Sequence, residues 1–434
     1  MIDQTERQQI IDLIKREVVP AIGCTEPIAV ALCVARATEL LGCMPKHIDV
    51  RLSANILKNA MGVGIPGTGM IGLPIAIALG AAIGRSEYEL EVLKDCTPQA
   101  VEAGRQYIAS GAIDIKLKQG IAEKLYIEVR VEDTNGKEAL AIIAGGHTHF
   151  VYLVKDGQVL LDQRVASKAE GESSEPQLSM AKVWEFATST PLDELRFILE
   201  SRNLNKAAAE QSFCGHYGHE LGRIIRNSKT EHAVLGDNTF ARIISYTSAA
   251  CDARMAGAMI PVMSNSGSGN QGITATMPVV VFAEDNNCSE EQLIRALALS
   301  HLTVIYIKQS LGRLSALCGC VVAASGSSCG ITYLMGGSYE QVCYAVKNMV
   351  ANLTGMVCDG AKPSCALKVT SGVSMAVLSA ILAKEDKYVT SVEGIVDDDV
   401  DQSIRNLTSI GREAMNETDR MVLDIMTHKG VKED

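Results

Sequence analysis

The spacing of apolar residues changes along this 434-residue chain, and the change limits the folds that it can adopt. Between about residues 46 and 165, apolar and polar residues alternate as they do in half-buried β-strands. A helical pattern near residues 90–109 interrupts this stretch, and after the polar segment at residues 165–179 the spacing is helical almost to the end. The pattern predicts an α+β fold, with a mixed N-terminal α/β portion on a mostly antiparallel sheet and a large, mostly helical domain after it. The alternating segments are "HIDVRLS", "IDIKLKQ", "KLYIEVRVE", "ALAIIAGG" and "HFVYLV".

Two more helical patterns precede the sheet, near residues 5–20 and 27–41, with Gly23 and Pro27 between them. We expect residues 1–45 to form N-terminal helices that pack on the helical domain. Residues 46–165 are then the α+β domain, and residues 166–434 are the helical domain. The polar segment "VASKAEGESSEPQLS", residues 165–179, is predicted to be a linker or an exposed loop.

Composition and charge exclude several classes of partner. A formal net charge of -11, only 4% aromatic residues and the lack of a Lys/Arg cluster argue against a nucleic-acid surface and against binding to anionic membranes. The charged, helix-patterned start has no signal-peptide pattern, so a cytoplasmic location is expected. Residues 61–84 are uncharged, but repeated Gly and Pro leave only about ten good helical residues, which favours a buried segment over a membrane span. We expect a small-molecule partner.

The chain has thirteen cysteines, which in a reducing compartment are not expected to form a disulfide framework. Cys358 and Cys365 lie in a polar turn, and Cys318, Cys320 and Cys329 precede them near a helix of small residues. Three or more of these thiols could converge in the helical domain. Zinc is disfavoured because the chain has no CxxC pair, whereas an iron–sulfur cluster needs no such spacing and, with three ligands, would keep one iron open for substrate. Cysteines in helical, apolar surroundings are expected to be inert: Cys33, Cys43, Cys251 and Cys343.

The segment "SNSGSGNQGITATMP", residues 264–278, mixes side chains that can donate hydrogen bonds with glycines that leave backbone N–H groups accessible. This composition is typical of an anion cradle, although a plain connection between helices is the alternative. Because no GK[ST] pattern follows, a carboxylate fits at least as well as a phosphate. Lys58 or Arg254 would supply a counter-charge. The expected substrate-binding residues are Ser264, Asn265, Gly267, Gly269, Asn270 and Lys58.

Cys24 stands at a junction between two helical patterns. With Thr25 as N-cap and Pro27 in the first turn, the second helix would direct N–H groups and a positive dipole end towards Cys24. Such a position favours a thiolate, so Cys24 is the first candidate for a catalytic base. His147, in "GGHTH", is the second candidate, with a structural histidine bonded to backbone as the alternative.

Six segments together resemble the bacterial and archaeal L-cysteine desulfidase family, which is related in its helical half to the iron–sulfur L-serine dehydratases. They are "GCTEP" (23–27), "PGTGMIGLP" (66–74), "GGHT" (145–148), "SNSGSGNQGITATMPV" (264–279), "LSALC" (314–318) and "CDGAKPSCALK" (358–368). The resemblance implies a [4Fe–4S] enzyme that converts L-cysteine to pyruvate, ammonia and sulfide. It also implies Cys318, Cys358 and Cys365 as cluster ligands and a role for Cys24, with Cys320 and Cys329 left as alternatives to Cys318.

Other functions remain open at this point. An L-serine dehydratase would use the same site with a hydroxyl leaving group. A non-catalytic protein that senses iron or sulfide, and a silent scaffold with zinc or empty thiols, are the readings from other classes. We expect a homo-oligomer such as a homodimer, no nucleic-acid or membrane partner, and a cluster that is lost in air.

Overall fold

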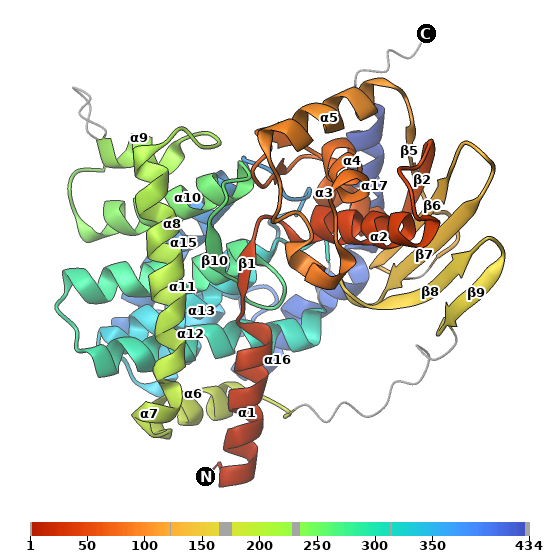
Figure 1. The fold of residues 1–434 in the computed structure, drawn as a ribbon. Coiled ribbons are helices and arrows are strands. Elements are labelled where there is room, and N and C mark those ends of the chain that lie inside the picture. The colour runs from red at the N-terminus through yellow and green to blue at the C-terminus, as the bar shows by residue number, and fades with distance from the viewer. Residues whose placement is uncertain (1, 122, 165–175, 228–234, 313–314, 430–434) are drawn as a thin grey trace.

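The computed structural model describes residues 2–121, 123–164, 176–227, 235–312 and 315–429. Two parts lie side by side: an α/β part built on a six-stranded sheet, and a largely helical part (Figure 1). The predicted α+β class is confirmed. The predicted linker at residues 165–179 falls mostly outside the described residues.

Six strands build the sheet, in the order β5 (Ile113–Leu117), β2 (His47–Leu52), β6 (Tyr126–Glu132), β7 (Glu138–Ala144), β8 (Phe150–Lys155) and β9 (Gln158–Asp162). β2 and β5 run parallel, and the other neighbouring pairs are antiparallel, so the prediction of a mostly antiparallel sheet is confirmed. The carboxylate of Asp133 orders the turn between β6 and β7, because it accepts hydrogen bonds from the backbone N–H groups of Asn135 and Lys137.

Three helices complete the core of the α/β part: α2 (Thr25–Leu41), α4 (Leu73–Ala82) and α5 (Pro98–Ala109). α2 lies on β6 and β7, and α4 packs against α2 and α5. Gly80 permits the close approach of α4 to α2, since a Cβ there would stand 2.6 Å from the carbonyl oxygen of Ala31. The helix expected near residues 90–109 is two elements, a short 3-10 helix η1 (Ser86–Glu91) and then α5, with Thr97 as N-cap.

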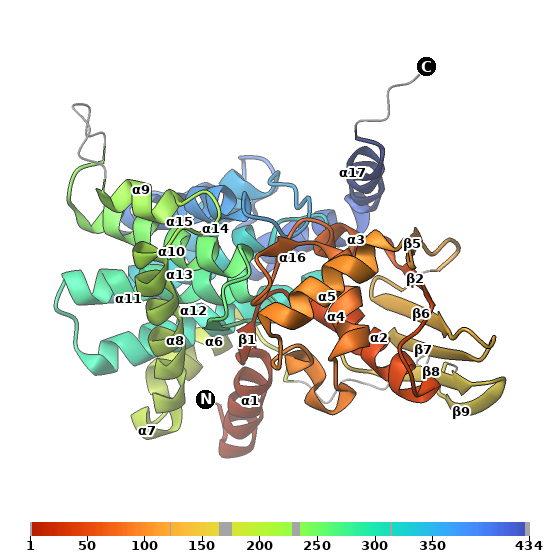
Figure 2. The ribbon, with the colours of Figure 1, turned by 45° about the horizontal axis from the view of Figure 1, so that its top comes forward.

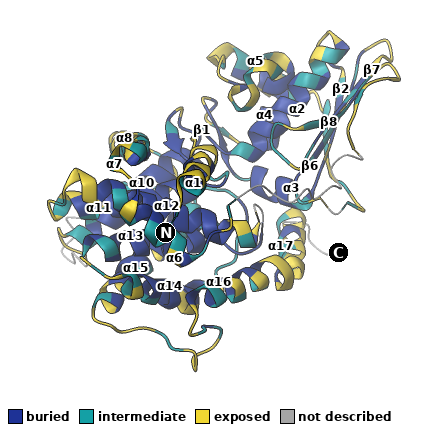
Figure 3. Cartoon of the chain, turned by 90° about the horizontal axis from the view of Figure 1, so that it is seen from below, coloured by how far each residue is buried: buried dark blue, intermediate teal, exposed yellow. Residues whose placement is uncertain are grey.

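The helical part is centred on α13 (Gly319–Leu334), which packs against α11 (Gly269–Asp285), α12 (Glu290–Leu311), α14 (Tyr339–Leu353) and α15 (Cys365–Lys384). Almost every residue of α13 is buried, and Figure 3 shows this core in dark blue. Small residues allow the tight packing: a Cβ at Gly326 would stand 2.4 Å from the carbonyl oxygen of Ser300. The outer elements are α6 (Met180–Ser189), α7 (Leu192–Leu195), η3 (Arg196–Ile198), α8 (Leu199–Cys214), α9 (Leu221–Asn227), α10 (Thr239–Met255), α16 (Val400–Ser409) and η4 (Ile410–Ala414).

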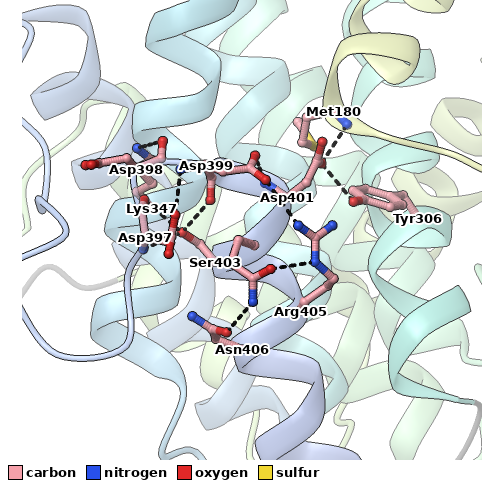
Figure 4. Close-up of polar contacts among 11 residues, drawn as sticks. Met180, Tyr306, Lys347, Asp397, Asp398, Asp399, Asp401, Ser403, Arg405 and Asn406 are labelled. Atoms are coloured by element: carbon pink, nitrogen blue, oxygen red, sulfur yellow. Dashed lines mark hydrogen bonds and ion pairs between the residues drawn. The ribbon is translucent and has the colours of Figure 1, made fainter.

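The start of α16 is fixed to its neighbours by polar contacts (Figure 4). The carboxylate of Asp401 accepts hydrogen bonds from the backbone N–H of Met180 at 2.9 Å and from the hydroxyl of Tyr306 at 2.7 Å. Lys347 on α14 donates to the carbonyl oxygen of Asp398 at 2.6 Å. These contacts hold the last part of the chain against α6, α12 and α14 before it turns back towards the α/β part.

Two elements at the ends of the chain depart from the expected division into domains. α1 (Gln4–Glu17) packs on α12, but α2 packs on the sheet, which corrects the expectation that residues 1–45 would all pack on the helical domain. The reason is that α2 is apolar on most of its surface and needs a core around it. The last helix, α17 (Asn416–His428), contacts α3 (Ala54–Ala60) of the α/β part, and Figures 1 and 2 both draw it there.

Residues 61–84 form the short strands β3 (Gly64–Ile65) and β4 (Met70–Ile71) and then the buried helix α4, as expected for a core segment. Among the described residues, α15 is the one helix long and apolar enough to cross a bilayer. α15 packs against α10, α13 and α14, as a core helix does.

Candidate active site

Two short β pairings bring distant segments of the chain together. β1 (Pro20–Ile22) pairs with β10 (Pro261–Met263), so Cys24, which follows β1, meets the loop that follows β10. Ser264 continues the pairing: its backbone N–H and its hydroxyl both donate to the carbonyl oxygen of Val19, at 2.8 and 2.6 Å. The hydroxyl of Ser264 is therefore used to hold the loop.

The second pairing joins the segments that carry two of the predicted cluster ligands. Leu317 and Val357 form an isolated antiparallel bridge. On either side of it, the N–H of Cys318 donates to the carbonyl of Met356 at 2.9 Å, and the N–H of Cys358 donates to the carbonyl of Ala316 at 2.7 Å. The bridge therefore places Cys318 and Cys358 diagonally across from each other on one face of the pairing, although they are 40 positions apart in the sequence.

Four helix N-termini meet at one cavity of about 110 Å³. They belong to α2, α11, α13 and α15, which contribute Cys24, Ser268, Cys318 and Cys365 to its wall. The first N–H groups of a helix have no partner within the helix, and the helix end carries a partial positive charge. A cavity at four such ends favours an anionic ligand.

One wall of the cavity consists of thiols. Cys318, Cys358 and Cys365, the three ligands implied by the resemblance, all line it, and so does Cys320. A hydrogen bond from the Cys320 thiol, opposed by burial, lowers the pKa of Cys318 to about 7. Burial raises the pKa of Cys365 to about 11, with a contribution from the nearby Cys358 and Cys318. Cys329 does not line the cavity and lies in the core of the helical part, which removes it as an alternative ligand.

In the described part of the chain, no three or more His, Cys, Asp or Glu side chains stand close enough together to hold a single metal ion. A cluster of several irons takes one thiolate at each of several irons, so its ligands need not meet at one point. The donor set fits such a cluster in kind, because thiols from three separate segments face one cavity and soft thiolates are the usual ligands of iron–sulfur clusters.

A buried cation also lines this cavity. Arg254 is 3% exposed, and its Nη1 donates to Oδ1 of Asn270 at 3.0 Å. Its Nε has no hydrogen-bond partner, and no carboxylate forms an ion pair with it among the residues that the structure describes. Gly269 leaves the room that Arg254 occupies, because a Cβ there would stand 2.1 Å from Nε. Gly267, Ser268, Asn270 and Gln271 line the cavity beside it.

Two other residues of the predicted anion loop have structural roles. Asn265 does not line the cavity: its side-chain amide contacts the ring and the carbonyl oxygen of His301, each at 3.1 Å. Lys58 is 1% exposed and also lies outside the cavity wall, in contrast to the prediction that it binds substrate. Its ammonium group pairs with Asp419 of α17 and donates to the carbonyl oxygen of Cys358 at 3.3 Å, so it holds the loop that carries a thiol.

Cys24 lines the cavity but is not the thiolate that the sequence predicted. It is itself the N-cap of α2, in place of Thr25, and its thiol donates to Oε2 of Glu26 at 2.9 Å. Burial, and then the negative charge of Glu26, raise the pKa of the Cys24 thiol well above its usual value. Glu26 itself also lines the cavity. Sequence reasoning missed Glu26, although it stands in the first turn of α2 within the "GCTEP" segment.

His147, the second predicted base, lies in the connection between β7 and β8 and does not line the cavity. It is close enough to Glu26 to act on it electrostatically. Burial alone would raise the pKa of Glu26, but His147 and the bond from Cys24 hold it below its usual range. The two predicted bases are thus connected through one carboxylate.

Comparisons with known proteins identify the family of this chain. A family model described as serine dehydratase alpha chain matches residues 87–424. A UPF0597 protein of Phocaeicola vulgatus is 72% identical over 429 residues, which cover 99% of this chain and 99% of that protein. A UPF0597 protein of Oleidesulfovibrio alaskensis is 49% identical over 425 residues, which cover 98% and 99%. The predicted relationship to the iron–sulfur serine dehydratases is confirmed, and this chain belongs to the serine dehydratase alpha-chain family.

Proposed function

We propose that this protein catalyses the α,β-elimination of L-cysteine to pyruvate, ammonia and sulfide, with a [4Fe–4S] cluster bound by Cys318, Cys358 and Cys365. The observation that supports it best is that several thiols and a buried guanidinium line the same small cavity. Families of this kind are typically associated with iron–sulfur clusters, which agrees with the donor set.

The substrate carboxylate would bind Arg254 and Asn270 at the N-terminus of α11. L-cysteine is small, so most of its binding free energy must come from its charged groups. A hydrogen bond to a charged group contributes about 1.5–3 kcal/mol, and Arg254 offers an unpartnered N–H in a buried position. The backbone N–H groups at Gly267 and Ser268 add the partial positive charge of the helix end.

The thiol wall would receive the other end of the substrate. When bound, the cluster supplies an open iron that acts as a Lewis acid towards the leaving atom at Cβ. The chain's own part is to hold the ligand loop, and two lysines do so through its carbonyl oxygens. Lys58 donates to the carbonyl oxygen of Cys358, and Lys368 donates to that of Val357 at 2.7 Å.

Elimination yields an aminoacrylate, which tautomerises and hydrolyses in water, so this step needs no further cofactor. Removal of the proton from Cα requires a base, and Cys24 lines the cavity. The predicted alternative function, an L-serine dehydratase, would use the same residues, and the family description favours it as the second candidate. The leaving group, sulfide or hydroxide, is what separates the two.

The test is an anaerobic reconstitution with iron and sulfide, followed by a pyruvate assay with L-cysteine, L-serine and D-cysteine. We expect pyruvate and sulfide from L-cysteine, and none from D-cysteine. Pyruvate from L-serine alone would make the protein a dehydratase. No pyruvate from either L-amino acid, in protein that has bound iron, would contradict both candidates.

A further inference from the structure

Among the described residues, Glu26 is the one carboxylate on the wall of the cavity. It is 8% exposed and uses both oxygens: Oε2 accepts from the thiol of Cys24 at 2.9 Å and from the hydroxyl of Thr25 at 3.1 Å, and Oε1 accepts from the amide of Asn59 at 3.2 Å. A carboxylate buried in this way is kept only where its charge is matched by donors. Glu26 is thus a prepared, charged group beside the space where the substrate would lie.

The charged and titratable groups around Glu26 come from several elements. Cys24 and Thr25 lie on α2 itself, and Asn59 lies on α3. His147 approaches from the connection between β7 and β8, and Arg254 from the C-terminal end of α10. The two cationic or basic groups stabilise the ionised carboxylate, while the same carboxylate disfavours a thiolate at Cys24. The pair therefore rests as a neutral thiol and a carboxylate.

We propose that Glu26 is the final proton acceptor of the elimination and that Cys24 relays the proton to it. The thiol gives its proton to Oε2 as the sulfur takes the proton from Cα. One S–H bond breaks, one O–H bond and a new S–H bond form, and the electron pair of the Cα–H bond forms the Cα=Cβ bond. The electron pair of the Cβ bond leaves with the substrate's sulfur. This inference rests on the proposed elimination.

The relay differs from the simpler alternative, in which a Cys24 thiolate is itself the base. A standing thiolate would lie 2.9 Å from an ionised carboxylate in a buried site, where like charges repel strongly. The relay avoids this, because only one negative charge is present at each stage. A third reading, in which Glu26 binds the substrate's ammonium group, predicts an effect on KM alone.

The first arm of the test uses metal-free protein and does not depend on turnover. The reactivity of Cys24 towards iodoacetamide is followed between about pH 6 and 10 by mass spectrometry of its peptide. Glu26→Gln removes the negative charge, so Cys24 should react at lower pH than in the wild type. Glu26→Asp keeps the charge and should leave the pH midpoint close to the wild-type value. Cys33, fully buried in α2, serves as the control within the same sample and should stay unreacted in every folded variant.

The second arm measures proton removal without elimination. L-Alanine has no leaving group, so exchange of its Cα hydrogen in deuterated water, followed by NMR, reports the base alone. In the reconstituted protein, Glu26→Gln should slow this exchange by about 10²-fold or more, the scale of a lost general base, although it makes Cys24 easier to ionise. Glu26→Asp should slow it less, and Cys24→Ala should slow it as much as Glu26→Gln.

The outcomes separate the two proposals. If Glu26→Gln keeps wild-type exchange, or raises only KM, the relay is wrong while the elimination stands. If Cys24→Ala keeps exchange, Glu26 acts directly and the relay is wrong. If the alkylation of Cys24 in Glu26→Gln has the same pH profile as in the wild type, the Glu26 carboxylate does not control the Cys24 thiol and the relay is wrong. A wild type that binds iron but turns over neither L-amino acid contradicts the proposed function, and the alkylation arm still decides on the pair.

Discussion

Two helices of this protein have a cysteine as N-cap at the same cavity, and their surroundings shift the pKa values of the two thiols in opposite directions. Cys24 is the N-cap of α2, and Cys318 is the N-cap of α13. Both are almost fully buried. Burial and Glu26 raise the pKa of Cys24, whereas the Cys320 thiol and, to a lesser degree, Lys368 lower the pKa of Cys318 to about 7.

The difference shows that neighbouring side chains affect the pKa of a thiol at a helix N-terminus more than the helix dipole does. The dipole at a helix terminus contributes about 0.3–1 kcal/mol. A unit charge about 4 Å away contributes about 4 kcal/mol at the effective dielectric of a protein. A carboxylate two residues into α2 therefore overrides the dipole that favours a thiolate at Cys24. At α13 the hydrogen bonds from Cys320 and the charge of Lys368 act in the same direction as the dipole and outweigh burial and the charge of Asp359, so Cys318 is the thiol suited to bind iron.

The largest expected effect comes from replacing the sulfur by oxygen at Cys318 and, in a second variant, at Cys24. Cys318→Ser should abolish iron binding after reconstitution, and turnover with it, because a soft ligand is lost. Cys24→Ser should keep its iron and lose turnover by about two or more orders of magnitude, since Cys24 handles a proton. Iron analysis and the pyruvate assay measure the two. Loss of iron from Cys24→Ser would make Cys24 a ligand and erase the contrast.

Replacing the buried guanidinium of Arg254, which lines the same cavity as both thiols, should have the next largest effect. Arg254→Met removes the guanidinium proposed for the carboxylate, so KM should rise by about 10- to 100-fold, the equivalent of one charge-assisted bond. Asn270→Ala is the matched variant and should raise KM less, because the guanidinium remains. If cysteamine, which lacks the carboxylate, inhibits the wild type as tightly as L-cysteine binds, no carboxylate site exists there.

The two thiols should also differ in reactivity when no metal is bound. The pKa of Cys318 is lowered and that of Cys24 is raised, so at about pH 8 a larger fraction of Cys318 should be thiolate and iodoacetamide should modify it at least about tenfold faster. Peptide mass spectrometry at short times measures both sites in one sample. Equal rates would mean that the contrast between the helices has no chemical consequence.

The smallest effect is expected from Lys368, which donates to the Val357 carbonyl and pairs with Asp359. Its positive charge favours the thiolate of Cys318, so Lys368→Met should raise the pKa of that thiol, by no more than about one pH unit. The alkylation profile of Cys318 in metal-free protein measures the shift. The profile of Cys24 should not move, and a parallel shift at both thiols would indicate a general loosening of the site.

Much of this arrangement could be predicted from the sequence, and the failures have physical causes. Alternating and helical spacing predict the sheet and the helices because burial follows local periodicity. The turn around Cys358 and Cys365 stands out for its polar composition. The pairing of β1 with β10 leaves no such signal, since three-residue strands carry too little pattern, yet it brings Cys24 to the anion loop.

The errors at single residues have the same origin. Lys58 and Arg254 are equivalent candidates in the sequence. Only the fold pairs Lys58 with Asp419, 361 positions away, while Arg254 forms no ion pair with a carboxylate of the described residues. The protonation state of Cys24 depends on the orientation of the Glu26 side chain, which cannot be predicted from the segment "GCTEP". The roles of the two cations and the protonation of Cys24 both depend on which charged groups the fold brings close together.

The ion pair between Lys58 and Asp419 also bears on how the protein matures in the cell. The lysine lies in the first seventh of the chain and the aspartate in its last helix, so the lysine's buried charge is matched only once nearly the whole chain has been synthesised. Until then the loop that carries Cys358 lacks one of its two anchors. Iron loading is therefore expected to follow the synthesis of α17, and a chain truncated before α17 should be a poor acceptor in a cluster-transfer reaction.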